Sequence, residues 1–459
     1  MPRRVGTITR RLLRFHNLHA RFRHTIARTP WRIHERKVLV GHARIGIETV
    51  TAHRAIIRRM RCANKLPRSP RARVLGLSVR GTAQMLEHED ILKELNRGAP
   101  IAEKLASVHR ALRERYAYID RVAVALYDPK TDVLKTFVDS TEGGSPLVRY
   151  EARLASSESL QAILRSGRPR VVQDLSIFAD VPAEHARRIG AHGYRASYTL
   201  PMYLDGAFFG FVFFNSLKEE PFTPEALHIL DVFGHLVSLV IISEISHIQT
   251  LLGAIKSARS ITHHRDYETG AHLDRMAHYA QLIARGLADK HQLSDEYIEH
   301  VFLFAPLHDV GKIAIPDRIL LKAAMLDKQE REQMQKHTLK GRQIVDEMLA
   351  DFGLGELPRL ELLRNIVQSH HEAIDGSGYP QGLKGDAIPI EARIIAVADV
   401  FDALTSARPY KRAWSNEAAF EAMLRLADIK LDRDCVEAIV NQREKVEAIQ
   451  ARFREEAYA

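Results

Sequence analysis

Histidine and aspartate residues recur beside apolar runs in the C-terminal half of the chain. His308 and Asp309 follow one such run, and His370 and His371 end another. A lone buried histidine is usually a satisfied core residue, but several buried imidazoles and carboxylates together are costly without a cation. We therefore treat the whole group as candidate metal ligands. Its members are Glu268, His272, His308, Asp309, His337, His370, His371 and Asp399.

These candidate ligands offer nitrogen and oxygen atoms only. The chain has two cysteines, Cys62 and Cys435, which excludes a disulfide framework and a cysteine-rich zinc site. Imidazoles and carboxylates in this number favour iron or manganese, with zinc, nickel or magnesium as alternatives. A cluster of two or more divalent ions stabilises both the attacking and the leaving oxygen of a phosphoester. The set therefore points to phosphoester hydrolysis.

The motifs around these residues resemble the HD-GYP domain, a branch of the HD phosphohydrolase superfamily. Motif order and spacing both agree with that family. The matching segments are 266–272, 307–317, 334–337, 370–380, 398–404 and 408–411. The resemblance implies an all-α helical domain that hydrolyses the bacterial second messenger cyclic di-GMP to pGpG, GMP or both. Such an enzyme is a phosphoric diester hydrolase.

The resemblance also assigns roles to single residues. All the candidate ligands would bind metal, with Glu268 permitting a third ion beside the two that other members hold. His308, Asp309 and Lys312 would be catalytic, and Lys312 would face the scissile phosphate.

A second set of residues would bind the rest of the substrate. By the same resemblance, Arg408 and Lys411 would grip the other phosphate. Gly378 and an exposed Tyr379 would contact the ligand or a partner protein. Alternatively, the glycines and the proline of segment 376–380 only shape a turn.

Two further functions stay open on the sequence. The domain could be a cyclic dinucleotide receptor or scaffold that acts through contacts with a diguanylate cyclase (GGDEF) partner. It could also hydrolyse another phosphoester, such as cyclic GMP-AMP, because metal ligands do not select a base. Since no ligand position is lost, the active cyclic di-GMP phosphodiesterase is favoured.

The preceding part of the chain alternates strands with short helices. Apolar runs at 121–127, 133–138 and 170–172 predict strands, and Asp205-Gly206 between two apolar runs predicts a hairpin. This order, over residues 88–245, resembles a GAF domain, a family of sensor modules that bind small ligands. Its ligand cannot be read from the sequence, and a domain that only dimerises is an equal alternative.

The expected fold is therefore a multidomain α+β protein. We expect a basic extension over 1–85, a GAF-like domain over 86–228, a connecting helix over 229–255 and the HD-GYP domain over 256–459. In the connecting helix, apolar residues at three- and four-residue spacing predict a homodimer seam. They are Ile229, Val232, Phe233, Leu236 and Val240, followed by Ser243.

The net charge of +10 comes from one end of the chain. Residues 1–80 contain 21 Lys and Arg but only two acids, whereas the remainder has 46 bases and 55 acids. The basic segment is either an arm for anionic lipid or nucleic acid, or a poorly ordered extension upstream of a start at Met85. The acidic remainder gives no case for specific nucleic-acid binding. No uninterrupted apolar run of about 18 residues occurs, so we expect a cytoplasmic protein without a transmembrane segment.

Overall fold

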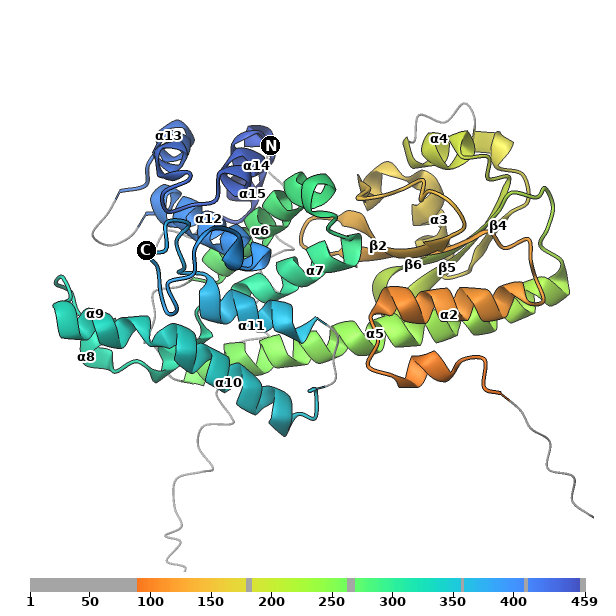
Figure 1. Ribbon diagram of the computed structural model, residues 1–459. Helices are drawn as coiled ribbons and strands as arrows, with labels where there is room; N and C mark the ends of the chain where they lie inside the picture. The colour runs from red at the N-terminus through yellow and green to blue at the C-terminus, as the bar shows by residue number, and fades with distance from the viewer. Residues whose placement is uncertain (1–88, 179–183, 262–268, 356–358, 408–411, 455–459) are drawn as a thin grey trace, which may run out of the picture. The chain divides into compact units, whose positions relative to one another are not determined.

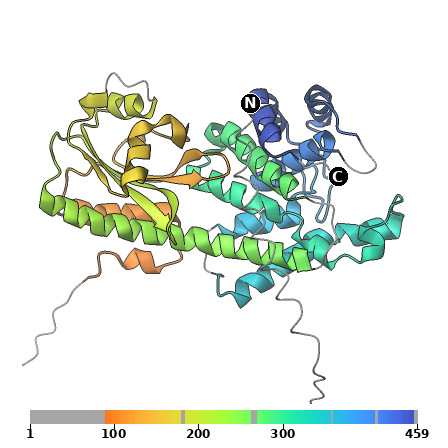
Figure 2. The ribbon, with the colours of Figure 1, turned by 180° about the vertical axis from the view of Figure 1, so that it is seen from behind.

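The computed structural model describes residues 89–178, 184–261, 269–355, 359–407 and 412–454. These residues belong to one compact unit, Glu87–Ala459. They form a sheet domain followed by a helical domain (Figures 1 and 2). The basic segment 1–85, and with it both interpretations of that segment, lies outside the described residues.

The sheet domain is built on one six-stranded sheet whose neighbouring strands are all antiparallel. The strand order is β3-β2-β1-β6-β5-β4. The strands are β1 (Arg121–Asp128), β2 (Val133–Thr141), β3 (Glu151–Arg153), β4 (Arg170–Val172), β5 (Ala196–Leu204) and β6 (Ala207–Ser216). The three strands predicted singly are confirmed, whereas β3 was not predicted.

The two faces of the sheet have different partners. Two helices, α2 (Ile101–Arg113) and α5 (Pro224–Ile261), lie side by side against one face (Figures 1 and 2). Because side chains alternate along a strand, Val122 points into the core under these helices while Ala123 and Ala125 point to the other face. That second face carries α3 (Glu158–Ser166), and α4 (Glu184–Ala191) follows β4.

β5 and β6 form the predicted hairpin. Leu204 pairs with Ala207, and the two residues between them, Asp205 and Gly206, have φ angles of 50° and 83°. A two-residue loop with both φ angles positive matches the twist of the flanking strands and selects Asx-Gly sequences. The local sequence therefore explains the turn.

The long helix α5 bears on the expectation that the chain has no transmembrane segment. Its segment Pro224–Ile255 is long and apolar enough to cross a membrane by length and composition, and its most apolar 18-residue stretch has a mean hydropathy of 1.9. The sequence argument considered only uninterrupted apolar runs. It therefore did not detect this segment, which is interrupted by single charged residues such as Glu244. A third of its most apolar stretch is buried inside the protein. Ile241 packs in the core of the sheet domain and Leu251 in that of the helical domain, so the buried side of α5 joins both cores.

The helical domain packs around one apolar core, as the sequence predicted. Its α-helices are α6 (Gly270–His291), α7 (Asp295–Phe304), α8 (Asp317–Leu320), α9 (Lys328–Gln335), α10 (His337–Asp351), α11 (Leu360–Ser369), α12 (Ile390–Thr405), α13 (Asn416–Leu426), α14 (Arg433–Val440) and α15 (Arg443–Arg452). Short 3₁₀ segments η4 (Ala305–Leu307) and η5 (Val310–Ala314) join α7 to α8. The core residues come mainly from α6, α7, α11, α12 and α14.

The helices α9 and α10 are separated by a single residue, Lys336. A capping box formed by Asp327 and Glu330 opens α9. This helix ends at Gln335 and α10 begins at His337. The Nδ1 of His337 bonds to the carbonyl of Met334, 2.8 Å away. This break places His337 at the start of α10.

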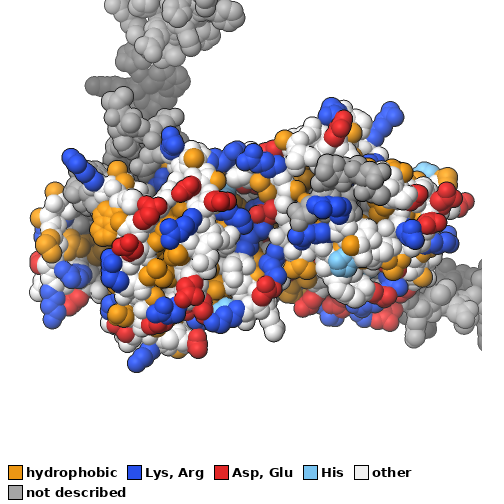
Figure 3. All heavy atoms as spheres, turned by 90° about the horizontal axis from the view of Figure 1, so that it is seen from above, with side chains coloured by type: hydrophobic (Ala, Val, Ile, Leu, Met, Phe, Trp, Pro, Cys, Tyr) orange, Lys and Arg blue, Asp and Glu red, His pale blue; other side chains and the backbone are white. Residues whose placement is uncertain are grey.

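Charged side chains of both signs are spread over the face of the described part that Figure 3 shows. On the face in Figure 3, Lys and Arg side chains alternate with Asp and Glu side chains over both domains. On this face the described residues form no extended patch of one sign.

Candidate metal centre

The helical domain brings most of the candidate ligands to one place from separate elements. His272 lies in the first turn of α6, and His337 begins α10. His308 and Asp309 occupy the turn between η4 and η5, His370 and His371 follow the end of α11, and Asp399 lies in α12. Glu268 falls outside the described residues.

These side chains form two groups of potential ligands. In each group the ligand atoms all lie within 4.8 Å of one another. One group contains Asp309, His337, His370 and His371, and the other contains His272, His308 and Asp399. Each group thus combines imidazole nitrogen with carboxylate oxygen, as a first-row divalent metal prefers.

The carboxylate of Asp309 lies between the two groups. Its Oδ1 is 3.1 Å from His337 Nε2 and 3.6 Å from His370 Nε2. Its Oδ2 is 3.3 Å from His308 Nε2, and His308 belongs to the other group. One oxygen of Asp309 therefore faces each group, which is the arrangement of a bridging carboxylate.

The histidine tautomers are fixed by backbone contacts. The Nδ1 atoms of His308, His337 and His370 lie 2.8–2.9 Å from the carbonyls of residues three or four positions earlier. A carbonyl only accepts hydrogen bonds, so each Nδ1 carries the proton and each Nε2 presents a lone pair. Metal-binding histidines are commonly oriented in this way.

The lone pairs in this site face one another, which is unfavourable without a cation. Within the described part of the chain, His337 Nε2, His370 Nε2 and Asp309 Oδ1 are buried and have no hydrogen-bond partner. With its proton on Nδ1, His337 sets an acceptor only 3.1 Å from a carboxylate oxygen. Buried acceptors in such contact are costly unless a positive charge lies between them. The residues therefore fit a divalent metal ion.

The pKa values also suit metal binding. Burial alone would raise the pKa of Asp309, but Lys312 and His308 hold it well below its usual range. Burial lowers the pKa of His370, and burial together with neighbouring His370 lowers that of His371 well below its usual value. The carboxylate is thus ionised and the imidazoles of His370 and His371 are neutral near pH 7, which are the forms that bind metal.

Asp402 is a site residue that the sequence argument missed. Its carboxylate accepts a 2.7 Å hydrogen bond from Nδ1 of His272 and two bonds from Arg275, at 2.6 and 2.9 Å. It thereby holds His272 with Nε2 turned away from Asp402. The only available signal was the spacing of Asp399 and Asp402 on α12, which does not show which partner each contacts.

Two glycines permit close backbone approaches at the site. A Cβ at Gly311 would lie 1.9 Å from the carbonyl oxygen of His337 and 2.4 Å from the nitrogen of Gly341. Gly311 therefore allows η5 to contact α10, which sets Asp309 beside His337. A Cβ at Gly378 would lie 2.3 Å from the nitrogen of Ala373.

Segment 376–380 folds back over the site. Tyr379 was expected to be exposed, but its ring is mostly buried, 4.8 Å from the ring of His371. Glu372 holds the following residues, because its carboxylate accepts hydrogen bonds from the backbone of Gln381 and Leu383. The close fit of Gly378 supports the shaping role left open above, and Tyr379 covers a candidate ligand.

The predicted phosphate-binding residues are described only in part. Lys312 Nζ lies 2.5 Å from Asp309 Oδ2, and about a quarter (24%) of its side chain is exposed. It thus places a cation at the edge of the site. Arg408 and Lys411 fall outside the described residues.

The comparisons with known proteins agree with the sheet domain and the helical domain described above. Residues 101–241 match the family model of the GAF domain. Residues 268–435 match that of the HD domain. The chain carries a GAF domain followed by an HD domain. The recognition of both families from the sequence is confirmed, as is the fold expected from them.

Curated relatives match less than half of the chain. One is the cyclic di-GMP phosphodiesterase response regulator RpfG of Xanthomonas campestris, 44% identical over 43% of this chain and 49% of its own length. Another is a cyclic di-GMP phosphodiesterase of Thermotoga maritima, 36% identical over 45% of this chain and 53% of its own. A third is 3'3'-cGAMP-specific phosphodiesterase 2 of Vibrio cholerae, 39% identical over 41% of this chain and 34% of its own. The matches thus span about half, or less, of the relatives' lengths.

Solved structures with GAF domains are also similar to the chain. The GAF domain/HD domain protein from Geobacter sulfurreducens is 18% identical, with 33% of this chain and 95% of that chain covered and a TM-score of 0.26. The phycocyanobilin-bound GAF domain of a cyanobacterial phytochrome is 14% identical, with 36% and 98% covered and a TM-score of 0.28.

Proposed function

We propose that the protein is a metal-dependent phosphodiesterase that hydrolyses cyclic di-GMP to pGpG, GMP or both. The observation that carries this proposal is the position of Asp309, with one carboxylate oxygen facing each group of histidines. That arrangement suits two adjacent divalent ions, and the named relatives are cyclic dinucleotide phosphodiesterases. Iron or manganese fits the ligand set best.

In this proposal the two groups of ligands hold the metal ions. The ions would supply Lewis acidity toward the phosphoester and a nucleophilic water at neutral pH. Asp309 would hold the two sites at a fixed separation. Lys312, partly exposed beside Asp309, would offset charge that develops on the phosphate oxygens. Tyr379, over His371, would restrict the access of water to that side.

A second candidate substrate is a cyclic dinucleotide with one adenine, such as 3'3'-cGAMP. Relatives named as specific for this compound match part of the chain at up to 39% identity. The metal ligands act on the phosphoester and do not contact the bases. The two substrates must therefore be separated by assay.

We further propose that the GAF domain regulates the HD domain through α7. Thr136 of β2 donates a 2.6 Å hydrogen bond to Asp295, the first residue of α7. The buried Lys135 beside it pairs with Glu299 on the same helix, at 3.0 Å. At its other end α7 leads through η4 to His308. A shift of β2 would thus reach a candidate ligand through one short helix.

We also propose a homodimer, with α5 at its centre. Val232 and Leu239 are 63% and 66% exposed on this helix. Ile229, Phe233 and Leu236 instead pack against the core of their own domain. The seam would therefore use Val232 and Leu239, together with Ser243, and part of the seam expected from the sequence belongs to the monomer core.

The enzyme proposal is tested with full-length protein purified under anaerobic conditions. We expect about two or more equivalents of iron or manganese per chain and conversion of cyclic di-GMP, with 3'3'-cGAMP as the competing substrate. Asp309→Ala should abolish turnover and lower the metal content, because one carboxylate serves both groups. Asp386→Ala is the matched control, since that side chain is 99% exposed.

Two results would overturn this proposal. One is unchanged turnover in Asp309→Ala. The other is a fully metallated wild-type protein that binds cyclic di-GMP without product, which would favour the receptor function instead.

A further inference from the structure

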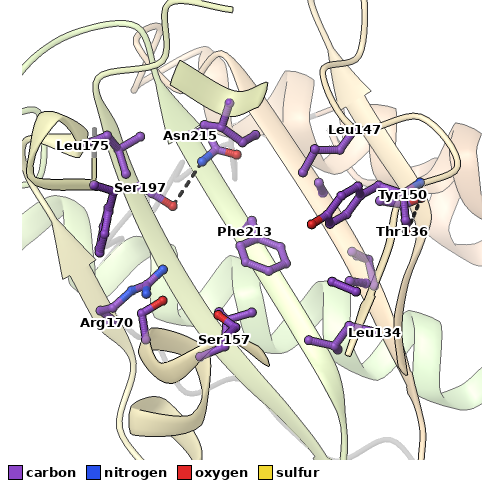
Figure 4. Close-up of a pocket in the computed structure, with 18 of the residues that line it drawn as sticks. Leu134, Thr136, Leu147, Tyr150, Ser157, Arg170, Leu175, Ser197, Phe213 and Asn215 are labelled. Carbon is purple, nitrogen blue, oxygen red and sulfur yellow. Dashed lines mark hydrogen bonds between the residues drawn. The ribbon is translucent and has the colours of Figure 1, made fainter. Parts of the chain in front are cut away.

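The sheet face opposite α2 and α5 carries a cavity of about 570 Å³. This volume lies in the range of sites for small organic molecules. Phe213 of β6 forms its floor, and the hydroxyl of Tyr150 points into it (Figure 4). Half of the other lining side chains are apolar, among them Leu134, Leu147 and Leu160, and most of the exposed lining surface is apolar. The cavity therefore suits a ligand with an apolar body.

Its charged lining is unbalanced. Four arginines stand against two acids: Arg121, Arg153, Arg165 and Arg170 against Asp139 and Glu158. Arg121 has a hydrogen-bond partner and a nearby carboxylate within the domain. It donates a 2.9 Å hydrogen bond to Asn215, and Asp139 lies 3.9 Å from its Nε.

Arg170 differs from Arg121 in having no anionic partner among the described residues. Its Nε and Nη1 atoms are buried and make no hydrogen bond. Its Nη2 contacts the hydroxyl of Thr199 at 3.4 Å, and its guanidinium carbon lies 5.7 Å from the centre of the Phe178 ring. Burial lowers the pKa of Arg170, and no neighbouring carboxylate acts against this effect. Figure 4 shows its guanidinium directed into the cavity from the start of β4.

A partly buried guanidinium with two buried N–H groups that make no hydrogen bond is costly, and the cost falls when an anion binds it. The planar fork of arginine binds a carboxylate through two parallel hydrogen bonds. The apolar walls exclude a strongly hydrated ligand such as a free inorganic ion. Together, these features require one anionic group on an apolar body.

We propose that this cavity binds a small organic carboxylate with an aromatic or aliphatic body. Its carboxylate pairs with Arg170, and its body lies on Phe213 between Tyr150 and Leu134. The proposal concerns binding and stands whether or not the HD domain is an enzyme.

Occupancy of the cavity has a direct route to the helical domain. Tyr150 lines the cavity, and its backbone N–H donates a 3.0 Å hydrogen bond to the hydroxyl of Thr136. That hydroxyl in turn donates to Asp295 at the start of α7. A ligand that moves Tyr150 therefore acts on a contact shared by both domains.

The test measures binding to the full chain by calorimetry and thermal unfolding. The probes are benzoate, phenylacetate, indole-3-acetate and octanoate, each beside its uncharged amide. We expect at least one carboxylate to bind and to raise the Tm, and its amide to bind about tenfold or more weakly, because charged hydrogen bonds are the stronger ones.

Arg170→Met distinguishes a ligand site from a structural arginine. This variant should lose carboxylate binding by about tenfold or more, yet its unliganded Tm should equal or exceed that of the wild type, because an uncompensated buried charge is removed. Arg195→Met is the control, since Arg195 is 55% exposed in its side chain and pairs with Glu219 at the surface.

Three outcomes would overturn the assignment. They are no binding by any of the four carboxylates, equal binding by acids and amides, and a marked loss of unliganded stability in Arg170→Met. The last would show that Arg170 stabilises the fold rather than a ligand.

Discussion

Asp309 is the residue on which the geometry of the candidate metal centre depends. Each of its carboxylate oxygens lies 3.1–3.3 Å from the Nε2 of a different histidine, His337 or His308. Those histidines donate their Nδ1 protons to backbone carbonyls, so the facing atoms are all acceptors. The repulsion among them is relieved by cations, which makes metal binding and the stability of this site interdependent.

At the residue scale, Asp402 gives a prediction that separates orientation from ligation. Asp402→Asn keeps the size of the side chain but loses the charge that orients His272 and pairs with Arg275. We expect metal affinity to fall about 10- to 100-fold at the group that contains His272, with the other group retaining its ion. Metal analysis after dialysis at graded metal concentrations measures this. Equal loss of both ions would contradict the assignment of Asp402 to one group.

The pH dependence of the metal-free protein follows from the buried histidines. Folding lowers the pKa of His370 and His371 below about 6.5, the ordinary value of histidine. Below that pH the unfolded chain therefore binds more protons than the folded chain, and stability decreases as pH falls. Urea unfolding of chelator-treated protein at pH 7 and pH 5.5 should show this loss. His371→Gln should reduce the difference, and an unchanged difference would exclude His371 as a source.

The residues of the site were readable from the sequence, but their partners were not. Histidines and aspartates beside apolar runs identify candidate ligands because burial of such groups is costly. The division into two groups and the role of Asp402 depend on contacts between α6 and α12, which are 130 positions apart in the case of His272 and Asp402. Such contacts are set by tertiary packing, which local spacing does not encode.

At the element scale, the close backbone contact between η5 and α10 positions Asp309. We predict that Gly311→Ala disrupts this approach, because the added Cβ would overlap the carbonyl oxygen of His337 and the backbone of Gly341. The backbone must shift, at a cost of about 1–3 kcal/mol in the free energy of unfolding, and metal content should fall with it. Gly144→Ala is the control, since nothing lies within 4 Å of a Cβ there. Wild-type metal content in Gly311→Ala would show that the approach is not needed.

Elements with strong local signals were predicted, and those held by tertiary contacts were missed. The β5–β6 hairpin follows from Asp205 and Gly206, whose φ angles are both positive. By contrast, β3 has only three residues and exists because it pairs with β2. The end of α9 at Gln335 also lacks a glycine or proline signal, so the local sequence does not indicate the boundary between α9 and α10.

At the scale of the whole molecule, the contact between the two domains is held by complementary charges. The GAF domain contributes Lys130 and Lys135, and the HD domain contributes Asp274 and Glu299. The pair of Lys130 with Asp274 is partly exposed, and such pairs contribute little to stability. The pair of Lys135 with Glu299 is buried, with side chains only 4% and 10% exposed. The pair of Lys135 with Glu299 should therefore contribute more to stability than the pair of Lys130 with Asp274.

We predict that Lys135→Met destabilises the protein by about 3–5 kcal/mol, because it leaves the buried charge of Glu299 with Gln281 as its remaining hydrogen-bond donor. The double variant Lys135→Met/Glu299→Leu should recover most of this loss, since an apolar pair avoids the cost of burying charge. Urea unfolding of these two variants and of Glu299→Leu completes a double-mutant cycle. Lys130→Met is the control for a surface charge. A cost below about 1 kcal/mol for Lys135→Met would mean that the pair is solvated in solution. The contact between β2 and α7 would then be too weak to carry a signal from the GAF cavity to His308.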